Sequence, residues 1–119
     1  MYGIPKDLDL TKAVGELITQ ICVGQFDIQF DIGGIHFSVY SPVILMKDGN
    51  ITARWNEGVW PGSGFIEIFN VKVINYSIPD KKTIILNFEN GIEMYLRDSS
   101  DEYESMSITI EGIPNIWII

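Results

Sequence analysis

Apolar residues occupy every second position along much of the chain, which is the period of a β-strand with one buried face. The alternation runs through residues 26–32, with Phe26 as its first apolar member, and again through residues 35–39. Gly33-Gly34 lies between the two runs and permits the positive φ angles of a tight turn. The pattern predicts a β-hairpin with one buried and one solvated face.

A second hairpin is predicted over Val43–Lys47 and Asn50–Trp55, because Asp48-Gly49 between them is a typical turn pair. Ser41-Pro42 precedes this hairpin, and proline has no N–H to donate to a central ladder. We therefore expect a break in the sheet between the two hairpins.

The second half of the chain continues the alternation. Two apolar pairs, Ile66 with Ile68 and Val71 with Val73, predict one or two strands with a kink near Asn70. Turns are predicted at residues 78–82 and at Asn90-Gly91. Three further strands and a final edge strand are predicted at Ile84, Leu86 and Phe88; Ile92, Met94 and Leu96; Met106, Ile108 and Ile110; and Trp117-Ile118-Ile119.

Helical signal is confined to the N-terminal segment. Thr11 can cap a short helix over residues 12–17, which Gly15 weakens, and we expect the first strand to begin at about Ile18. Apolar residues make up 46% of the 119, so residues 1–119 can form a single domain with one core. The expected fold is mainly β: an antiparallel β-sandwich or partly open barrel of about eight strands, with at most one short N-terminal helix.

Two predicted hairpins resemble each other in sequence. Residues 28–37 align with residues 86–94 as apolar–polar–Phe–acid, a glycine turn and apolar–polar–apolar, with one extra residue in the first copy. One interpretation is a pair of pseudo-repeated hairpin units that arose by duplication. The other is convergence, because periodicity and turn chemistry impose this pattern on any amphipathic hairpin.

The net charge is −8, from 16 acidic and 8 basic side chains. This charge repels phosphate backbones and anionic lipids, so it disfavours nucleic-acid and membrane partners and favours a basic protein; the alternative is that it only maintains solubility. The N-terminal residues lack the apolar stretch of a signal peptide, and the longest apolar run, residues 43–46, is too short to cross a bilayer. We therefore expect a cytoplasmic protein.

Residue types that carry catalysis are scarce. Cys22 is the sole cysteine and is expected to be a small buried hydrophobe, so no internal disulfide can form. His36 is the sole histidine, and by alternation it shares the polar face with Asp27, Gln29 and Asp31, where it can pair with a carboxylate. No nucleophile motif, phosphate-binding loop or zinc ligand set is present, so the sequence assigns no catalytic residue, metal or cofactor.

A long glycine-rich loop is predicted over residues 55–64, with Trp55, Glu57 and Trp60 in or beside it. One hypothesis is that the loop presents the tryptophans as anchors to a partner. The other is that both tryptophans fold back over one end of the core, which removes a large apolar surface from water.

Residues 98–104 concentrate carboxylates around a tyrosine without any basic side chain. The run is open to three interpretations: a solvated loop, an acidic patch that faces a basic partner, and a calcium site, although the glycine and the terminal glutamate of an EF-hand are missing. The residues concerned are Asp98, Asp101, Glu102, Tyr103 and Glu104.

Four segments, in this order, resemble a family of small bacterial β-rich domains. They are a strand entry at residues 18–26, a Phe-Asp-x-Gly hairpin at residues 30–34, a Phe-x-x-Gly hairpin at residues 88–91, and Tyr103-Glu104-Ser105 ahead of the last strand. The resemblance covers residues 17–110. Domains of this kind are similar to immunity proteins encoded beside bacterial toxins, including those of contact-dependent growth inhibition. The long loop over residues 55–64 departs from their compact pattern.

The resemblance implies a binding protein and not an enzyme. It implies a cognate toxin domain as the partner, often a nuclease with a basic cleft, whose active site the protein covers. A competing hypothesis is a small barrel that binds a metabolite or acts as an enzyme, with a dry cavity lined by Phe30, Phe37, Phe88 and Met94. A third is a homodimer that pairs its edge strands, since the sequence leaves the oligomeric state open.

Overall fold

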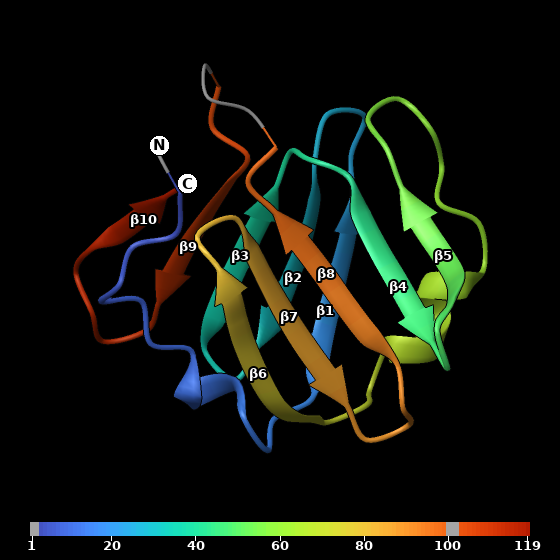
Figure 1. Cartoon of the computed structure of the whole chain (residues 1–119), viewed down its shortest axis with the longest axis horizontal. Helices are drawn as coiled ribbons and strands as arrows, with labels where there is room; N and C mark the ends of the chain where they lie inside the picture. The colour runs from blue at the N-terminus through green and yellow to red at the C-terminus, as the bar shows by residue number, and fades with distance from the viewer. Residues whose placement is uncertain (1–2, 100–102) are drawn as a thin grey trace.

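Two antiparallel sheets of five strands each stack on one another in the computed structural model, which describes residues 3–99 and 103–119. The strand order is β1-β2-β3-β9-β10 in the first sheet and β5-β4-β8-β7-β6 in the second. Figure 1 shows the second sheet in front of the first, with the strands of the two sheets crossing at an angle. The expected antiparallel sandwich is confirmed, and neither sheet closes into a barrel.

The described chain contains ten strands and two 3-10 helices. In chain order the elements are η1 Thr11–Ala13, β1 Ile18–Val23, β2 Ile28–Ile32, β3 Ile35–Val39, β4 Val43–Lys47, β5 Asn50–Trp55, η2 Gly64–Ile68, β6 Val73–Asp80, β7 Thr83–Phe88, β8 Glu93–Arg97, β9 Met106–Ile110 and β10 Ile116–Ile118.

Both hairpins of the first half lie where the alternation predicts them. β2 and β3 pair with Ile32 opposite Ile35, and β4 and β5 pair around Asp48-Gly49. Gly33 and Gly34 have φ of 55° and 82°, as a tight turn of this kind requires. Burial alternates strictly along β2 and β3, so one face of the hairpin packs inward.

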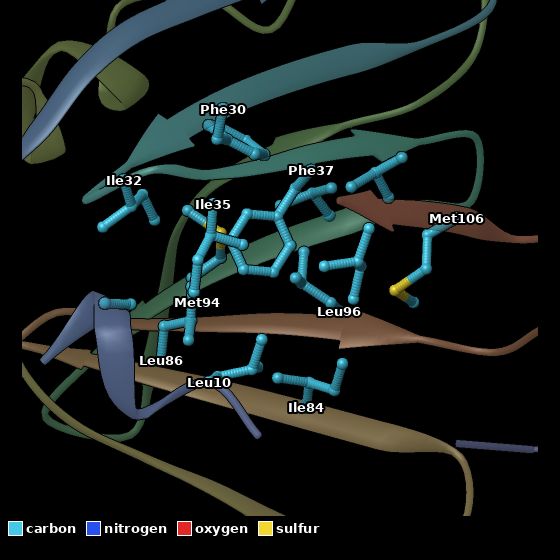
Figure 2. Close-up of a cluster of buried hydrophobic side chains, with 14 of the residues drawn as sticks. Leu10, Phe30, Ile32, Ile35, Phe37, Ile84, Leu86, Met94, Leu96 and Met106 are labelled. Atoms are coloured by element: carbon cyan, nitrogen blue, oxygen red, sulfur yellow. The ribbon is translucent and has the colours of Figure 1, made fainter. Parts of the chain in front are cut away.

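The core fills the space between the sheets. Figure 2 shows Phe37 near its centre, with Ile35, Met94 and Leu96 around it and Leu10 of the N-terminal segment beside Ile84. The four residues expected to line a ligand cavity, Phe30, Phe37, Phe88 and Met94, are all fully or almost fully buried members of this cluster. The three surface pockets described in this structure are lined by other residues.

A bulge in β1 changes which of its side chains face inward. The pairing with β2 shifts between Ile18 and Gln20, so Ile18 and Ile21 both point to the core side although they are three residues apart. Cys22 is therefore directed to the outer face, opposite Gln29, and is partly exposed. The prediction of a buried cysteine is wrong for this reason.

Phe26 does not begin the buried alternation. It lies in the turn between β1 and β2, which Gly24 N closes by donating to Asp27 O at 2.8 Å. The side chain of Phe26 is 61% exposed. The alternation in the sequence therefore includes one apolar residue, Phe26, that lies in the turn and not in the buried strand.

Residues 66–68 form the end of a 3-10 helix and not a strand, so that prediction is wrong. Phe65 and Ile68 are buried while Ile66 and Phe69 are exposed, which is the three-residue repeat of a 3-10 helix. The predicted kink is confirmed, because Asn70 adopts a φ of 63° just after the helix.

The predicted turn at residues 78–82 and the predicted N-terminal helix are both shorter in the structure. β6 continues through Pro79 to Asp80, which an edge strand tolerates because its outer N–H groups need no partner. The N-terminal helix is only the three residues of η1, and the Thr11 hydroxyl donates to Asp9 rather than capping a longer helix. The predicted start of β1 at Ile18 is confirmed.

The two halves of the chain repeat one topology. Each half runs through a 3-10 helix, a three-stranded meander and a hairpin: η1-β1-β2-β3-β4-β5 and then η2-β6-β7-β8-β9-β10. In each half the hairpin crosses to the other sheet and pairs with the third meander strand of the other half, β4 with β8 and β9 with β3. The similarity seen between two hairpins in the sequence thus extends to the order of elements in whole halves.

Candidate functional site

The long connection between β5 and β6 is held against the edge of β1 at both of its ends. Near its start, Gly58 N donates to Gln25 O at 2.7 Å, just beyond the end of β1. Near its end, Asn70 N donates to Ile18 O at 3.0 Å, at the beginning of β1. The connection therefore follows the outer edge of β1 along its length, on the right-hand side of Figure 1.

An apolar groove of about 280 Å³ lies between this connection and β1. We call it the Trp60 groove. One wall is made by β1, and the other comes from the loop and from η2. Its lining residues are Ile21, Val23, Trp60, Pro61, Gly62, Phe65, Ile66 and Phe69.

η2 is fixed to the core by its buried side. The ring of Phe65 stacks on Phe30 of β2, with centroids 6.4 Å apart. Gly64 lies so close to Ala53 of β5 that a side chain at position 64 would overlap it. Because this buried side is held, Ile66 and Phe69 on the opposite side are presented to solvent by a short, anchored element.

Large apolar side chains gather on the surface around the groove. Trp60 is 74% exposed, and the other exposed members are Val59, Ile66 and Phe69. A second pocket, which shares Val23 and Trp60, continues the surface toward the β1–β2 turn. An exposed apolar cluster of this kind marks a contact surface more often than a solvated one.

The connection that forms one wall of the groove carries negative charge only. Residues 56–69 contain Glu57 and Glu67 and no lysine or arginine. Asp27, at the β1–β2 turn, does not face the groove: its carboxylate accepts a hydrogen bond from Gln29 Nε2 at 2.7 Å and lies beside Gly24, on the outer face of the first sheet. The groove lining is therefore apolar, and its acidic residues come from the connection.

The two tryptophans of the predicted loop behave differently. Trp55 is fully buried at the end of β5, opposite Val43, and its indole nitrogen has no hydrogen-bond partner. The hypothesis that both tryptophans cover the core is confirmed for Trp55 and wrong for Trp60. The prediction that Trp55 contacts a partner is corrected, because its side chain does not reach the surface. Trp60 and Glu57 are exposed, as a contact role requires.

The described residues of the acidic run 98–104 differ in burial. Asp98 is buried: its carboxylate accepts hydrogen bonds from Gly3 N at 2.9 Å and from Ser105 Oγ at 3.2 Å. Its expected place in a surface patch is therefore corrected, because it joins the N-terminal segment to the start of β9 instead. Tyr103, at 72%, and Glu104 are exposed.

The remaining members of the acidic run, Asp101 and Glu102, lie outside the described residues. Within residues 3–99 and 103–119, no three histidine, cysteine or acidic side chains gather as metal ligands would. The described ends of the β8–β9 connection lie at the same end of the sandwich as the start of the β5–β6 connection, but on the other side in Figure 1. The described members of the predicted partner-binding set thus fall in two separate places.

His36 pairs with a carboxylate on the outer face of the first sheet, as predicted. Its Nδ1 lies 2.6 Å from Asp31 Oδ1, and its Nε2 lies 3.0 Å from Gln29 Oε1. These side chains stand on neighbouring strands β2 and β3, and none of them lines a described pocket. The arrangement is a surface hydrogen-bond chain that joins two strands.

Most lining residues of the Trp60 groove are not predicted as site residues from the sequence. Ile21 and Val23 were expected only as strand residues, and Ile66 was assigned to a strand. The available signal was the three-residue spacing of Phe65 with Ile68 and of Ile66 with Phe69, which fits a 3-10 helix with one exposed apolar side. Trp60 alone was singled out in advance.

Comparison with protein-family models, with curated proteins and with solved structures finds no match. Among the described residues, no helix has the length and apolarity needed to cross a membrane.

Proposed function

We propose that this protein is an immunity-type inhibitor that binds a cognate bacterial toxin, a nuclease with a basic cleft, and covers the toxin's active site in the cytoplasm of the producing cell. The observation that carries the proposal is the Trp60 groove, an exposed aromatic surface beside a connection, residues 56–69, that contains two carboxylates and no basic side chain. The sequence resemblance to immunity proteins supplies the class of partner.

The Trp60 surface suits the energetics of a tight complex. A tryptophan buries roughly 150–250 Å². At about 25 cal/mol per Å² this corresponds to roughly 4–6 kcal/mol before ordering costs are subtracted. Trp60 exposes most of that surface in the free protein and stands beside a concave site, which is the usual setting of an interface hot spot.

The charge of the molecule suits the proposed target. A nuclease cleft is basic because it binds phosphates, and a surface with net charge −8 attracts it over a distance. Glu57 and Glu67, on the connection that carries Trp60, would stand opposite the cleft. Tyr103 and Glu104 form a second, separate place where the toxin would be contacted.

The test is to produce in cells the toxin domain that the proposal expects a neighbouring gene to encode, and to measure whether this protein protects them. Wild-type protein is expected to restore growth, whereas Trp60→Ala is expected to protect poorly at the same protein level. The matched control is Ile116→Ala, which removes another exposed apolar side chain, from β10 at the opposite edge of the first sheet. Failure of the wild-type protein to protect, or full protection by Trp60→Ala, would overturn the proposal.

A further inference from the structure

Part of the outer edge of β1 has peptide groups with no partner. Gly24 N donates to Asp27 O, so the peptide groups of Gly24 face β2. In an antiparallel pair this orientation alternates, so Cys22 also faces β2 while the peptide groups of Ile21 and Val23 point away from it. No hydrogen bond of Ile21 or Val23 to another segment is found in the described part of the chain.

This open stretch is short because the β5–β6 connection closes it at both ends. Ile18 is paired with Asn70 and Val71 on one side, and Gln25 is paired with Gly58 on the other. The unpaired peptide groups lie within residues 21–23, about 10 Å of strand. An incoming segment of three or so extended residues would fit there, and a long added strand would not.

The open edge and the Trp60 groove belong to the same residues. Ile21 and Val23 point their peptide groups outward, and their side chains form one wall of the groove. A chain that hydrogen-bonds to this edge would therefore carry its alternate side chains past Trp60, Ile66 and Phe69. The main chain supplies affinity in this mode of recognition, and the pocket supplies selectivity.

We propose that a short extended segment of the partner pairs with β1 at Ile21 and Val23, places apolar side chains in the Trp60 groove and carries flanking basic residues. The basic flanks follow from the carboxylates of Glu57 and Glu67, since residues 56–69 of the β5–β6 connection contain no lysine or arginine. A second copy of this chain is a poor occupant, because it would bring the same two carboxylates against each other. The proposal rests on the proposed function in that the segment would belong to the toxin.

The test uses the full-length protein and a synthetic probe, the capped peptide acetyl-Lys-Leu-Val-Leu-Lys-amide, followed by NMR at millimolar peptide. The peptide is expected to shift the backbone amide signals of Ile21 and Val23 and the indole signal of Trp60. Replacing both peptide lysines by glutamate is expected to abolish binding. The matched protein control is Ile116→Ala, which should bind the peptide as the wild type does.

Two N-methylated peptides separate strand pairing from simple apolar contact. Methyl groups on the amides that face β1 should weaken binding at least about fivefold, since each lost hydrogen bond is worth about 1 kcal/mol. Methyl groups on the alternate amides should change little. Equal binding of both methylated peptides, failure of the parent peptide to bind, or dimerisation of the protein through this edge would each overturn the proposal.

The peptide experiment does not involve the toxin, so the two proposals fail separately. If the peptide does not bind but the protein still protects cells, the strand pairing is wrong and the inhibitor function stands. If the peptide binds as expected but no protection is seen, the edge is a peptide site and the immunity function is wrong.

Discussion

Trp55 and Trp60 are five positions apart, yet the fold gives them opposite environments. Trp55 ends β5 and is enclosed between the sheets, while Trp60 stands on the connection that leaves β5 and is three-quarters exposed. The indole nitrogen of Trp55 is buried without a partner, so its contribution comes from packing alone. Stability and binding are thus divided between two residues of the same type.

Replacing each tryptophan should separate these contributions. Trp55→Ala removes a fully buried ring and is expected to lower the free energy of unfolding by about 3–5 kcal/mol. Trp60→Ala is expected to change it by less than about 0.5 kcal/mol, as exposed substitutions do. Urea unfolding of the two variants measures both values, and similar losses would contradict the assignment.

Two exposed carboxylates connect the fold to acid stability. The backbone N–H of Lys82 donates to Asp80 at 2.8 Å and lowers the pKa of Asp80 below its ordinary value. The hydroxyl and the N–H of Thr11 lower the pKa of Asp9 in the same way. Because the folded pKa lies below the unfolded one, these contributions are present above about pH 4 and are lost as pH falls through the lower, folded values.

The variant Asp80→Asn removes one of these contributions at neutral pH. It is expected to be less stable than the wild type at pH 7 and to show a shallower loss of stability on acidification. The difference should vanish at low pH, where Asp80 itself is protonated. Denaturant unfolding from pH 7 to pH 2 provides the comparison, and a difference that grows toward acid would contradict the sign of the effect.

At the scale of the element, the β2–β3 turn does more than reverse the chain. It packs against the N-terminal segment, where a side chain at Gly33 would meet Lys12 O at 2.7 Å and the side chain of Glu16. The β4–β5 turn has the same two-residue length, but a side chain at Gly49 would meet nothing within 4 Å. Both glycines have positive φ, of 55° and 78°.

The two turns therefore offer a matched comparison. Gly49→Ala is expected to cost about 1–2 kcal/mol, the strain of an alanine in the left-handed region. Gly33→Ala is expected to cost at least about 1 kcal/mol more, because the turn must also move away from residues 12–16. Thermal unfolding of both variants gives the two values, and equal costs would show that the N-terminal segment yields freely.

Local signals explain which elements the sequence predicts well. The hairpins at Gly33-Gly34 and Asp48-Gly49 combine a turn pair with strict alternation, and both signals lie within about a dozen residues. Cys22 and Phe26 were placed wrongly because a bulge and a turn displaced the alternation by one residue. The period of two identifies a strand but does not show where a bulge interrupts it.

The groove could not be predicted because it depends on contacts between distant segments. The apolar residues of η2 are compatible with a strand or a 3-10 helix, and what decides between them is Phe65 stacking on Phe30. Ile21 and Val23 face the connection because backbone hydrogen bonds of Ile18 with Asn70 and Val71, and of Gln25 with Gly58, hold it beside both ends of β1. The sequence indicates Trp60 as a candidate contact residue, but the residues around it come together only in the folded chain.

On the scale of the whole molecule, the repeated topology ends where the candidate surface begins. The connection that joins the two halves, from β5 to β6, is the segment that carries Trp60 and η2 and closes over β1. A scaffold of two interlocked halves holds that connection at both ends, since the hairpin of each half is hydrogen-bonded to the other. The surface proposed for binding is therefore held between two halves that are hydrogen-bonded to each other.

Hydrogen exchange of the complex with the proposed cognate toxin domain tests the central claim most directly, because it reports which backbone amides the partner covers. We predict slowed exchange in residues 20–25 and 58–69 and unchanged exchange in β10, at the far edge of the same sheet. Protection confined to residues 103–119, with the Trp60 groove exchanging as in the free protein, would contradict the account.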